Sequence, residues 1–238
     1  MDSVVGGEGA RGATASRGAL FRAPPARPLV AASILSADFS RLGDECRAVI
    51  AAGADAIHVD VMDGHFVPNL SMGPAVCAAV RRAVPGAMID VHLMVEQPSR
   101  FLEPFAKAGA DHCTVHREVE EDLPALLAQG HSLGMSMGVA INPDTPATAL
   151  ASIAEPCELM LVMSVHPGYS GQAFIPAVLD KVRSLRARFG ASRRIEIDGG
   201  VSPANAHSCV EAGVDVVVSA SALFGSRDYG ATIAALRG

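Results

Sequence analysis

A ten-residue pattern that occurs three times constrains the fold of this chain more than any other feature. Residues 51–60 read AAGADAIHVD, residues 107–116 read KAGADHCTVH, and residues 211–220 read EAGVDVVVSA. Each copy has the form of an Ala-rich helix end, a glycine suited to a left-handed cap, and an apolar β-rich run. Asp55, Asp111 and Asp215 lie 56 and then 104 residues apart, which divides into two units of 28 and four units of 26. That is the length of a strand, a crossover helix and two short loops.

Strand-like runs fill the positions that this spacing predicts. There are eight, at 28–34, 56–61, 88–94, 112–116, 137–142, 159–165, 194–198 and 214–220. Amphipathic segments such as 40–53 and 174–190 lie between them. Alternating β and α units with strands apolar on both faces indicate a parallel sheet covered by helices. Eight regular units predict a closed (β/α)8 TIM barrel of the α/β class rather than an open doubly wound sheet, whose G-x-G-x-x-G fingerprint is missing after the first strand.

The first 28 residues differ in composition from the rest. Residues 1–28 are rich in Gly, Ala, Arg and Pro and contain one aromatic residue, so they have little to bury. We expect a disordered or flexible extension at 1–28 and a single barrel domain at 29–238. An organellar transit peptide would also carry Arg and Ser, but Asp2 and Glu8 weigh against it.

Composition excludes several classes of protein. The net charge of -6, from 19 basic and 25 acidic residues, offers nucleic acid no overall basic face. The five cysteines are odd in number and form no C-x-x-C pair, which indicates free thiols in a reducing cytoplasm. No apolar run approaches the ~20 residues needed to cross a bilayer. We therefore expect a soluble, cytoplasmic protein whose partner is neither nucleic acid nor membrane.

Polar residues gather where predicted strands end. His58 and Asp60 share one face of the second strand because side chains alternate along a strand, the third strand adds His92, and the seventh ends in Asp198. Any one of them alone would more often be a polar residue at a barrel rim. Together, two imidazoles and two carboxylates at one end of one barrel predict a site for one divalent ion of zinc, iron(II), manganese or cobalt.

The other six histidines have no such partners in the sequence. We expect them at the surface or in supporting positions: His65, His112, His116, His131, His166 and His207.

Three turns at the same end of the barrel indicate an anion site. The glycine-bearing loop 167–171 follows the sixth strand, the turn 198–200 follows the seventh, and 220–221 follows the eighth. Backbone N–H groups in such turns can point at an anion, and the loops after strands seven and eight are a recurrent phosphate site in barrels. One glycine turn alone would be weak evidence, but three on neighbouring strands predict phosphate binding.

The absence of lysine from the predicted strand ends narrows the reactions that the chain could catalyse. Both lysines, Lys107 and Lys181, fall in predicted helices, which disfavours a Schiff-base aldolase. The remaining hypothesis is a metal ion and carboxylates that act on a ligand resembling a sugar phosphate.

Five motifs follow one another in a fixed order along the chain. They are SILSADF (33–39), HVDVMDGHFVPNL (58–70), DVHLMV (90–95), MSVHPGYSGQAFIP (163–176) and EIDGGV (196–201). In this order they resemble the signatures of the ribulose-phosphate 3-epimerase family, over about residues 29–238. The resemblance implies a metal-dependent enzyme of the pentose phosphate pathway that interconverts D-ribulose 5-phosphate and D-xylulose 5-phosphate. It also implies a homo-oligomer.

The resemblance assigns roles to particular residues. His58, Asp60, His92 and Asp198 match the metal ligands, and Asp60 and Asp198 match the two acid/base residues. Substrate or phosphate contacts are implied for Ser33, His92, Gly168, Tyr169, Ser170, Gly171, Asp198, Gly199, Gly200, Ala220 and Ser221. Inversion at C3 takes a proton from one face and returns one to the other, so the two aspartates would exchange roles with the direction of reaction. The cation would stabilise the enediolate as a Lewis acid.

The chain departs from the family pattern in its phosphate loops. Where the family usually has N-P-G-F-G-G, this chain has His166, Tyr169 and Ser170, and Ala220 stands where the family usually has glycine. If Ser170 or Ala220 has to adopt a positive φ, we expect the loop to shift or phosphate to bind more weakly.

Three alternatives stay open at this point. The first is a 3-epimerase of a related ketose phosphate such as D-allulose 6-phosphate, with the same metal site. The second is a hexulose-phosphate synthase or orotidine-phosphate decarboxylase, but both require D-x-K, and Asp60-Val61-Met62 has no lysine. The third is a catalytically silent barrel that binds a sugar phosphate.

Overall fold

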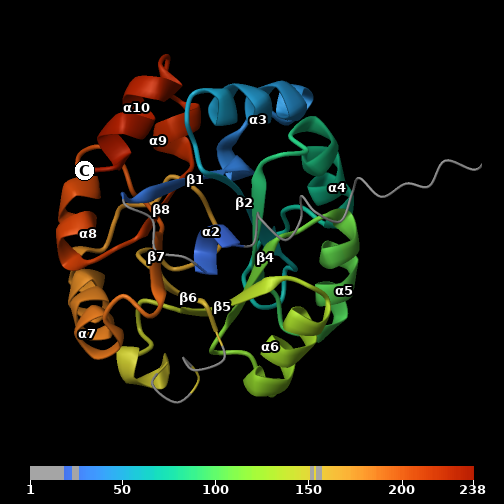
Figure 1. The fold of residues 1–238 in the computed structure, drawn as a ribbon, viewed down its shortest axis with the longest axis vertical. Coiled ribbons are helices and arrows are strands. Elements are labelled where there is room, and N and C mark those ends of the chain that lie inside the picture. Colours follow the sequence, from blue (N-terminus) through green and yellow to red (C-terminus); the bar gives the residue numbers. More distant parts are fainter. Residues whose placement is uncertain (1–18, 23–26, 151–152, 154–156) are drawn as a thin grey trace, which may run out of the picture.

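The computed structural model describes residues 19–22, 27–150, 153 and 157–238. Within these residues, eight strands form a closed parallel barrel in which β8 pairs with β1 (Figure 1). The strands are β1 (Leu29–Ser33), β2 (Ala56–Met62), β3 (Met88–Met94), β4 (His112–His116), β5 (Ser136–Ile141), β6 (Leu159–Met163), β7 (Arg194–Asp198) and β8 (Val216–Ser219). The predicted (β/α)8 barrel is confirmed.

Helices surround the barrel (Figure 1). They are α3 (Leu42–Ala51), α4 (Pro74–Ala83), α5 (Ser99–Ala108), α6 (Leu123–Ser132), α7 (Leu179–Phe189), α8 (Ala206–Ala212), α9 (Ser221–Phe224) and α10 (Tyr229–Leu236). Between β5 and β6 the described chain contains the short 3-10 turn Ala147–Leu150 instead of an α-helix. None of the described helices is both long enough and apolar enough to cross a membrane.

Alternation along each strand separates an outer core from the barrel interior. On β2, Ile57, Val59 and Val61 belong to the large apolar core that the helices cover. His58 and Asp60, the alternate residues, face the interior, where they meet side chains from other strands. The same alternation brings polar groups from several strands into one buried space.

The three aspartates of the repeat make the same contacts at the base of the barrel. Each stands immediately before an even-numbered strand, accepts a backbone N–H from the preceding strand at 2.9 Å, and forms an ion pair with an arginine. The sets are Asp55 with Val30 and Arg237, Asp111 with Ile89 and Arg81, and Asp215 with Ile195 and Arg186. Each arginine also donates to the carbonyl of the repeat glycine, which has a left-handed φ between 103° and 110°. The repeat therefore joins neighbouring strands in pairs.

The remaining pair of strands makes this contact with different residues. Glu158, immediately before β6, accepts the backbone N–H of Met137 on β5 at 2.9 Å. His131 of α6 lies 2.9 Å from the same carboxylate and takes the place of the arginine. The barrel thus has a fourfold repeat of strand pairs, and the sequence pattern displays three of the four.

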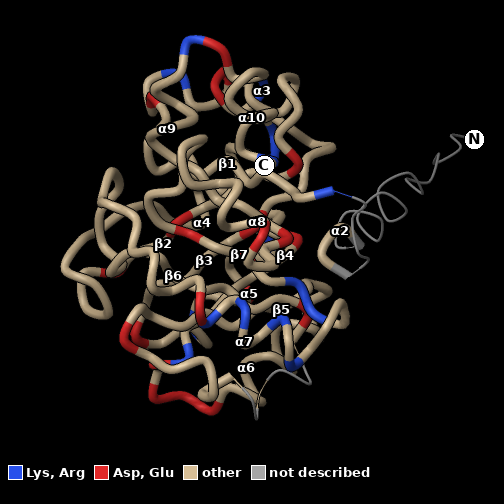
Figure 2. Tube along the Cα trace, turned by 90° about the vertical axis from the view of Figure 1, so that its left-hand side faces the viewer, with Lys and Arg blue, Asp and Glu red and all other residues tan. Residues whose placement is uncertain are grey.

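A short helix, α2 (Ala19–Arg22), lies across the N-terminal end of the barrel (Figures 1 and 2). Phe21 is 1% exposed and shares a buried cluster with Leu29, Ala56 and Met88, each at the start of a strand. Its ring meets His112 edge-on, with centroids 4.9 Å apart. The expectation that all of residues 1–28 stay outside the fold is therefore wrong for α2, because an aromatic ring here closes the barrel interior. Residues 1–18 and 23–26 lie outside the described residues.

We expect Asp111→Ala to lower the free energy of unfolding by about 2–4 kcal/mol, because it removes the carboxylate partner of the partly buried Arg81 guanidinium and leaves the Ile89 N–H without its acceptor. Urea unfolding followed by circular dichroism measures the loss. The matched control is Asp180→Ala, which removes an ion pair with Arg183 whose side chains are 84% and 57% exposed. That control is expected to cost less than about 1 kcal/mol. Equal losses in the two variants would contradict this account of the repeat.

Candidate functional site

The register of neighbouring strands positions the polar residues of the barrel interior. Between β2 and β3, His58 lies opposite Asp90 and Asp60 lies opposite His92. Asp198, the last residue of β7, lies opposite Met163, the last residue of β6. These residues therefore converge at the C-terminal ends of the strands, where barrel active sites form.

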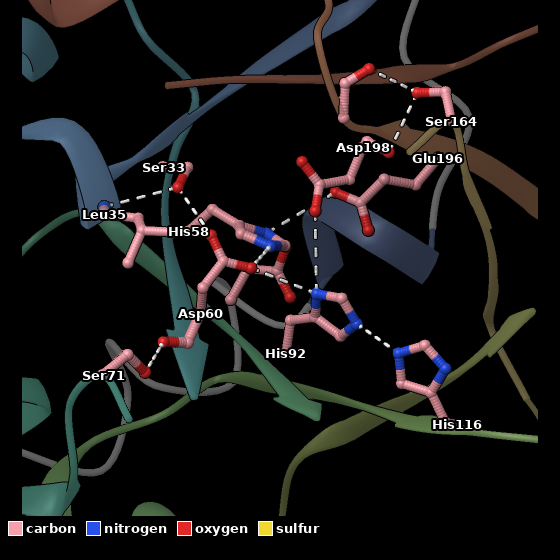
Figure 3. Close-up of polar contacts among 12 residues, drawn as sticks. Ser33, Leu35, His58, Asp60, Ser71, His92, His116, Ser164, Glu196 and Asp198 are labelled. Atoms are coloured by element: carbon pink, nitrogen blue, oxygen red, sulfur yellow. Dashed lines mark hydrogen bonds and ion pairs between the residues drawn. The ribbon is translucent and has the colours of Figure 1, made fainter. Parts of the chain in front are cut away.

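The four predicted metal ligands form one cluster. One ligand atom each from His58, Asp60, His92 and Asp198 lies within 4.8 Å of the others. Asp60 Oδ1 is 3.3 Å from His58 Nε2 and 3.2 Å from His92 Nδ1, and Asp198 Oδ2 is 3.7 Å from His92 Nδ1 (Figure 3). The structure brings together all four side chains that the sequence singled out.

The donor set fits a divalent metal ion. Ligands about 2.1 Å from a tetrahedral centre are about 3.4 Å from one another, close to the separations found here. Two imidazole nitrogens and two carboxylate oxygens suit zinc, iron(II), manganese or cobalt. His58 Nε2 is buried and has no hydrogen-bond partner among the described residues, as expected for a nitrogen that offers its lone pair to a cation.

Burial and mutual charge give the two aspartates different proton affinities. Burial raises the pKa of Asp198 to about 7, with a further contribution from the charge of Asp60. Burial alone would also raise the pKa of Asp60, but the charge of His58 and the contact with His92 hold it below its usual range. Two carboxylates this close repel one another, so a cation between them is electrostatically favoured.

The pKa values of the two imidazoles shift in opposite directions. Burial lowers the pKa of His92. Burial would also lower the pKa of His58, but the charges of Asp60 and Asp90 outweigh it and raise the pKa well above its usual value.

Polar groups that the sequence analysis did not assign to the site lie around the cluster. They are Asp90, His116 and Glu196, which are buried, and Glu118, whose side chain is 23% exposed. Asp90 Oδ2 lies 2.7 Å from His58 Nδ1. His116 Nε2 lies 2.9 Å from His92 Nε2 (Figure 3). Burial and the charge of Asp90 raise the pKa of Glu196 well above its usual value, and neither of its carboxyl oxygens has a hydrogen-bond partner among the described residues.

The spacing of residues along the strands contains a signal for Asp90 and Glu196. Asp90 and Glu196 each stand two residues before a predicted ligand, so they share its strand face. His112 and His116 were expected at the surface or in supporting positions. The structure buries both completely, because β4 directs the residues at both of its ends into the barrel interior.

A pocket at the mouth of the barrel collects the predicted substrate residues. All of them line it except His92, which is buried beneath: Ser33, Gly168, Tyr169, Ser170, Gly171, Asp198, Gly199, Gly200, Ala220 and Ser221. Met62, Met94 and Met163 add an apolar wall, and Asp60 lies in the lining beside Ser33. Ser33 Oγ donates to Asp60 Oδ2 at 2.6 Å. The pocket thus extends from the two aspartates to the glycine turns.

Two hydrogen bonds join the loop after β6 to the loop after β2. The Tyr169 hydroxyl donates to the carbonyl of Pro68 at 2.9 Å, and Asn69 Nδ2 donates to the carbonyl of Gly168 at 2.7 Å. Tyr169 is 58% exposed, so its ring covers the outer edge of the pocket. The two loops therefore meet over the entrance.

Glycine is required at the turn after β7 and is dispensable at the two positions where this chain departs from the family pattern. Gly200 has a φ of 65°, and a Cβ there would lie 2.6 Å from the Gln172 carbonyl and 2.8 Å from the Phe174 amide nitrogen. No described non-glycine residue has a positive φ, and Ala220 has a φ of −110°. Ser170 and Ala220 therefore do not adopt the left-handed backbone that favours glycine, and the shift expected if they had a positive φ does not arise.

Sequence comparison links the chain to one family. The model of the ribulose-phosphate 3 epimerase family matches residues 29–224. Ribulose-phosphate 3-epimerase of Synechocystis sp. is 48% identical over 214 residues, which cover 88% of this chain and 93% of that protein. The chloroplastic ribulose-5-phosphate-3-epimerase of Arabidopsis thaliana is 45% identical, covering 88% of this chain and 76% of that protein. The Escherichia coli (strain K12) ribulose-phosphate 3-epimerase is 44% identical, with coverages of 88% and 94%.

Structural comparison supports the fold. A 3-hexulose-6-phosphate synthase aligns with a TM-score of 0.65 at 19% identity, covering 89% of this chain and 98% of that chain. The enzyme KGPDC from Streptococcus mutans aligns with a TM-score of 0.66 at 12% identity, covering 88% and 95%. At these identities the likeness is one of architecture.

We expect Gly200→Ala to lower kcat/KM for a ketose phosphate by at least about tenfold, because a Cβ cannot fit against the backbone of residues 172 and 174 and the turn has to move. Steady-state kinetics measure the effect. Gly86→Ala is the control, since a Cβ there meets no atom within 4 Å and its φ is not positive. Unchanged kinetics in Gly200→Ala would show that the turn has no part in the site.

Tyr169→Phe is expected to raise KM about two- to fivefold with little change in kcat, because one hydrogen bond between the entrance loops contributes about 1 kcal/mol. The other tyrosine supplies the control. Tyr229 donates to Glu45 Oε2 at 2.7 Å, and neither residue lines the pocket, so Tyr229→Phe should leave KM unchanged. Similar KM changes in the two variants would argue against a specific link at the entrance.

Proposed function

The chain belongs to the ribulose-phosphate 3-epimerase family, and we propose that Asp60 and Asp198 are the acid/base pair with which it interconverts D-ribulose 5-phosphate and D-xylulose 5-phosphate. It is an epimerase, an enzyme of the isomerase class. One observation carries the assignment of roles: two aspartates from β2 and β7 meet at one end of a pocket whose other end is built from glycine turns.

The position of the two aspartates suits proton transfer on opposite faces of one carbon. Epimerisation at C3, next to the C2 carbonyl, removes a proton from one face and delivers one to the other. Asp60 and Asp198 come from strands that β1 and β8 separate around the barrel. A ketose bound between them would present one face to each carboxylate, and the two would exchange roles with the direction of reaction.

Neighbouring hydroxyl groups contact the carboxylate of Asp60 and the backbone of Asp198. Ser33 donates to Asp60 Oδ2, which leaves Oδ1 facing the imidazoles. Ser164 Oγ donates to the backbone carbonyl of Asp198 at 2.9 Å, which fixes the end of β7. A carboxylate with fixed orientation reaches the reacting carbon without a prior search for the right rotamer.

We assign one divalent cation per subunit, of zinc, iron(II), manganese or cobalt, to His58, Asp60, His92 and Asp198. A bound cation supplies Lewis-acid stabilisation of the negative charge on an enediolate. The chain itself excludes water from this end of the pocket, because both histidines are completely buried. Met62, Met94 and Met163 border the same space with thioethers, which have no exchangeable proton.

The phosphate group would bind at the glycine end of the pocket. None of the described residues that line the pocket is a lysine or an arginine, so charge neutralisation by a side chain is not the basis of binding there. The turns at 199–200 and 220–221 instead offer backbone N–H groups, the usual donors for phosphate in this part of a barrel. A small ketose phosphate is therefore the partner that we propose, and we further expect a cytoplasmic homo-oligomer.

The acid/base assignment is tested with Asp198→Asn in heavy water. We expect epimerisation to fall by about 10²- to 10⁴-fold, because one of the two proton-transfer groups is lost. Product ratios and deuterium at C3 are measured by NMR, and bound metal is measured on the same sample to separate chemistry from metal loss. The control is Asp44→Asn, which changes a residue whose side chain is 70% exposed. Retention of both epimerisation and C3 deuterium incorporation in Asp198→Asn would rule out the proposed role.

A further inference from the structure

A chain of buried polar contacts leads from His92 to the loop after β5. His92 Nε2 lies 2.9 Å from His116 Nε2, and His116 Nδ1 lies 3.1 Å from Glu118 Oε2 (Figure 3 shows the two imidazoles). Both histidines are completely buried. Their ring centroids lie 5.0 Å apart and their planes are inclined by 22°. The contact therefore holds two rings in a fixed mutual orientation.

The far end of the chain of contacts is firmly held. Glu118 Oε1 accepts the backbone N–H of Asn142 at 2.8 Å and the hydroxyl of Thr145. Lys181 Nζ in turn donates to the carbonyl oxygens of Asn142, at 3.0 Å, and of Thr145, at 2.6 Å. Phe66 packs on the His116 ring with centroids 4.8 Å apart. The carboxylate that ends the chain is thus fixed by backbone and side-chain donors.

The contacts allow one arrangement of protons that is compatible with metal binding. Two facing Nε2 atoms form a hydrogen bond only when one of them carries the proton. If His92 Nδ1 ligates a cation, its proton is on Nε2 and is donated to His116 Nε2. The proton of His116 is then on Nδ1, where Glu118 Oε2 accepts it. In the reverse arrangement, the His116 Nδ1 lone pair would face a carboxylate, and His92 Nδ1 would carry a proton toward the cluster.

We propose that His116 and Glu118 are positioning residues for the metal site: through the hydrogen bond to Nε2, they hold His92 with its Nδ1 lone pair aimed at Asp60 and Asp198. The inference rests on the metal site put forward above. His58, the other imidazole of the cluster, is held by a direct contact. Asp90 Oδ2 lies 2.7 Å from His58 Nδ1. The two imidazole ligands therefore have supports of different length, one a carboxylate and the other an imidazole followed by a carboxylate.

Substitution of His116 separates hydrogen bonding from packing. His116→Phe keeps a ring against Phe66 and removes the acceptor for His92, whereas His116→Gln loses the ring but keeps an acceptor at a similar distance from the main chain. The full-length, metal-free protein is titrated with Zn²⁺ against a chromophoric chelator, which measures zinc affinity without reference to catalysis. We expect His116→Phe to weaken zinc binding about 10- to 100-fold and His116→Gln to retain most of the affinity.

His112→Phe is the matched control. His112 is an equally buried histidine on the same strand, but its ring contacts Ser136 and Thr114, neither of which is a predicted metal ligand. We expect zinc affinity to remain within about twofold of the wild-type value in this variant. Glu118→Ala provides a second route if His116→Phe does not fold, and should weaken zinc binding in the same direction. Because both residues act through one chain of contacts, the double variant should lose little more than His116→Phe alone.

Each outcome of these titrations supports or overturns the positioning role or the metal assignment. Wild-type affinity in His116→Phe, or a greater loss in His116→Gln than in His116→Phe, would mean that the ring serves packing and would overturn the inference. Additive losses in the double variant would also overturn it. Absence of zinc binding by the wild-type chain would overturn the metal assignment itself, whereas wild-type binding with no effect of His116→Phe overturns only the positioning role.

Discussion

The register between β2 and β3 is the constraint on which the site depends. Seven consecutive residue pairs, from Ala56 opposite Met88 to Met62 opposite Met94, fix the alignment of these strands. Side chains alternate along a strand, so a slip by one residue would direct the ligands on β2 toward the helices and place Ile57 and Val59 in the barrel interior. The packing of those apolar residues in the outer core thus determines where His58 and Asp60 point.

The two ends of the barrel satisfy their buried charges in different ways. At the base, each carboxylate that precedes an even-numbered strand has both a backbone donor and a cationic or imidazole partner, which stabilises the pairing of strands. Around the cluster beneath the mouth, Glu196 has two oxygens, and Asp90 one, without a hydrogen-bond partner among the described residues. Such groups are costly to bury, and their concentration around one cluster indicates that stability has been given up there for function.

The glycine-turn end of the pocket shows how a family pattern can change without a demand for a left-handed backbone. Only a residue with a left-handed φ or a close backbone neighbour requires glycine, as Gly200 does. Ser170 and Ala220 have no positive φ, so their side chains alter the lining of the pocket without that demand. The hydroxyl of Tyr169 adds a hydrogen bond between two entrance loops, a contact that a phenylalanine cannot make.

The number of units, the closed barrel and the four candidate ligands could all be predicted from the order of residues, because the period of the repeat and the alternation of strand faces are local properties of the chain. The fourth copy of the contact at the base of the barrel could not be predicted, since Glu158 and His131 replace the aspartate and arginine of the other three copies. Nor does any local pattern show that Phe21 closes the barrel, or that Asp90 and His116 contact His58 and His92. Those contacts join residues on different elements, and only closure of the barrel, with its particular register and burial, decides which of them meet.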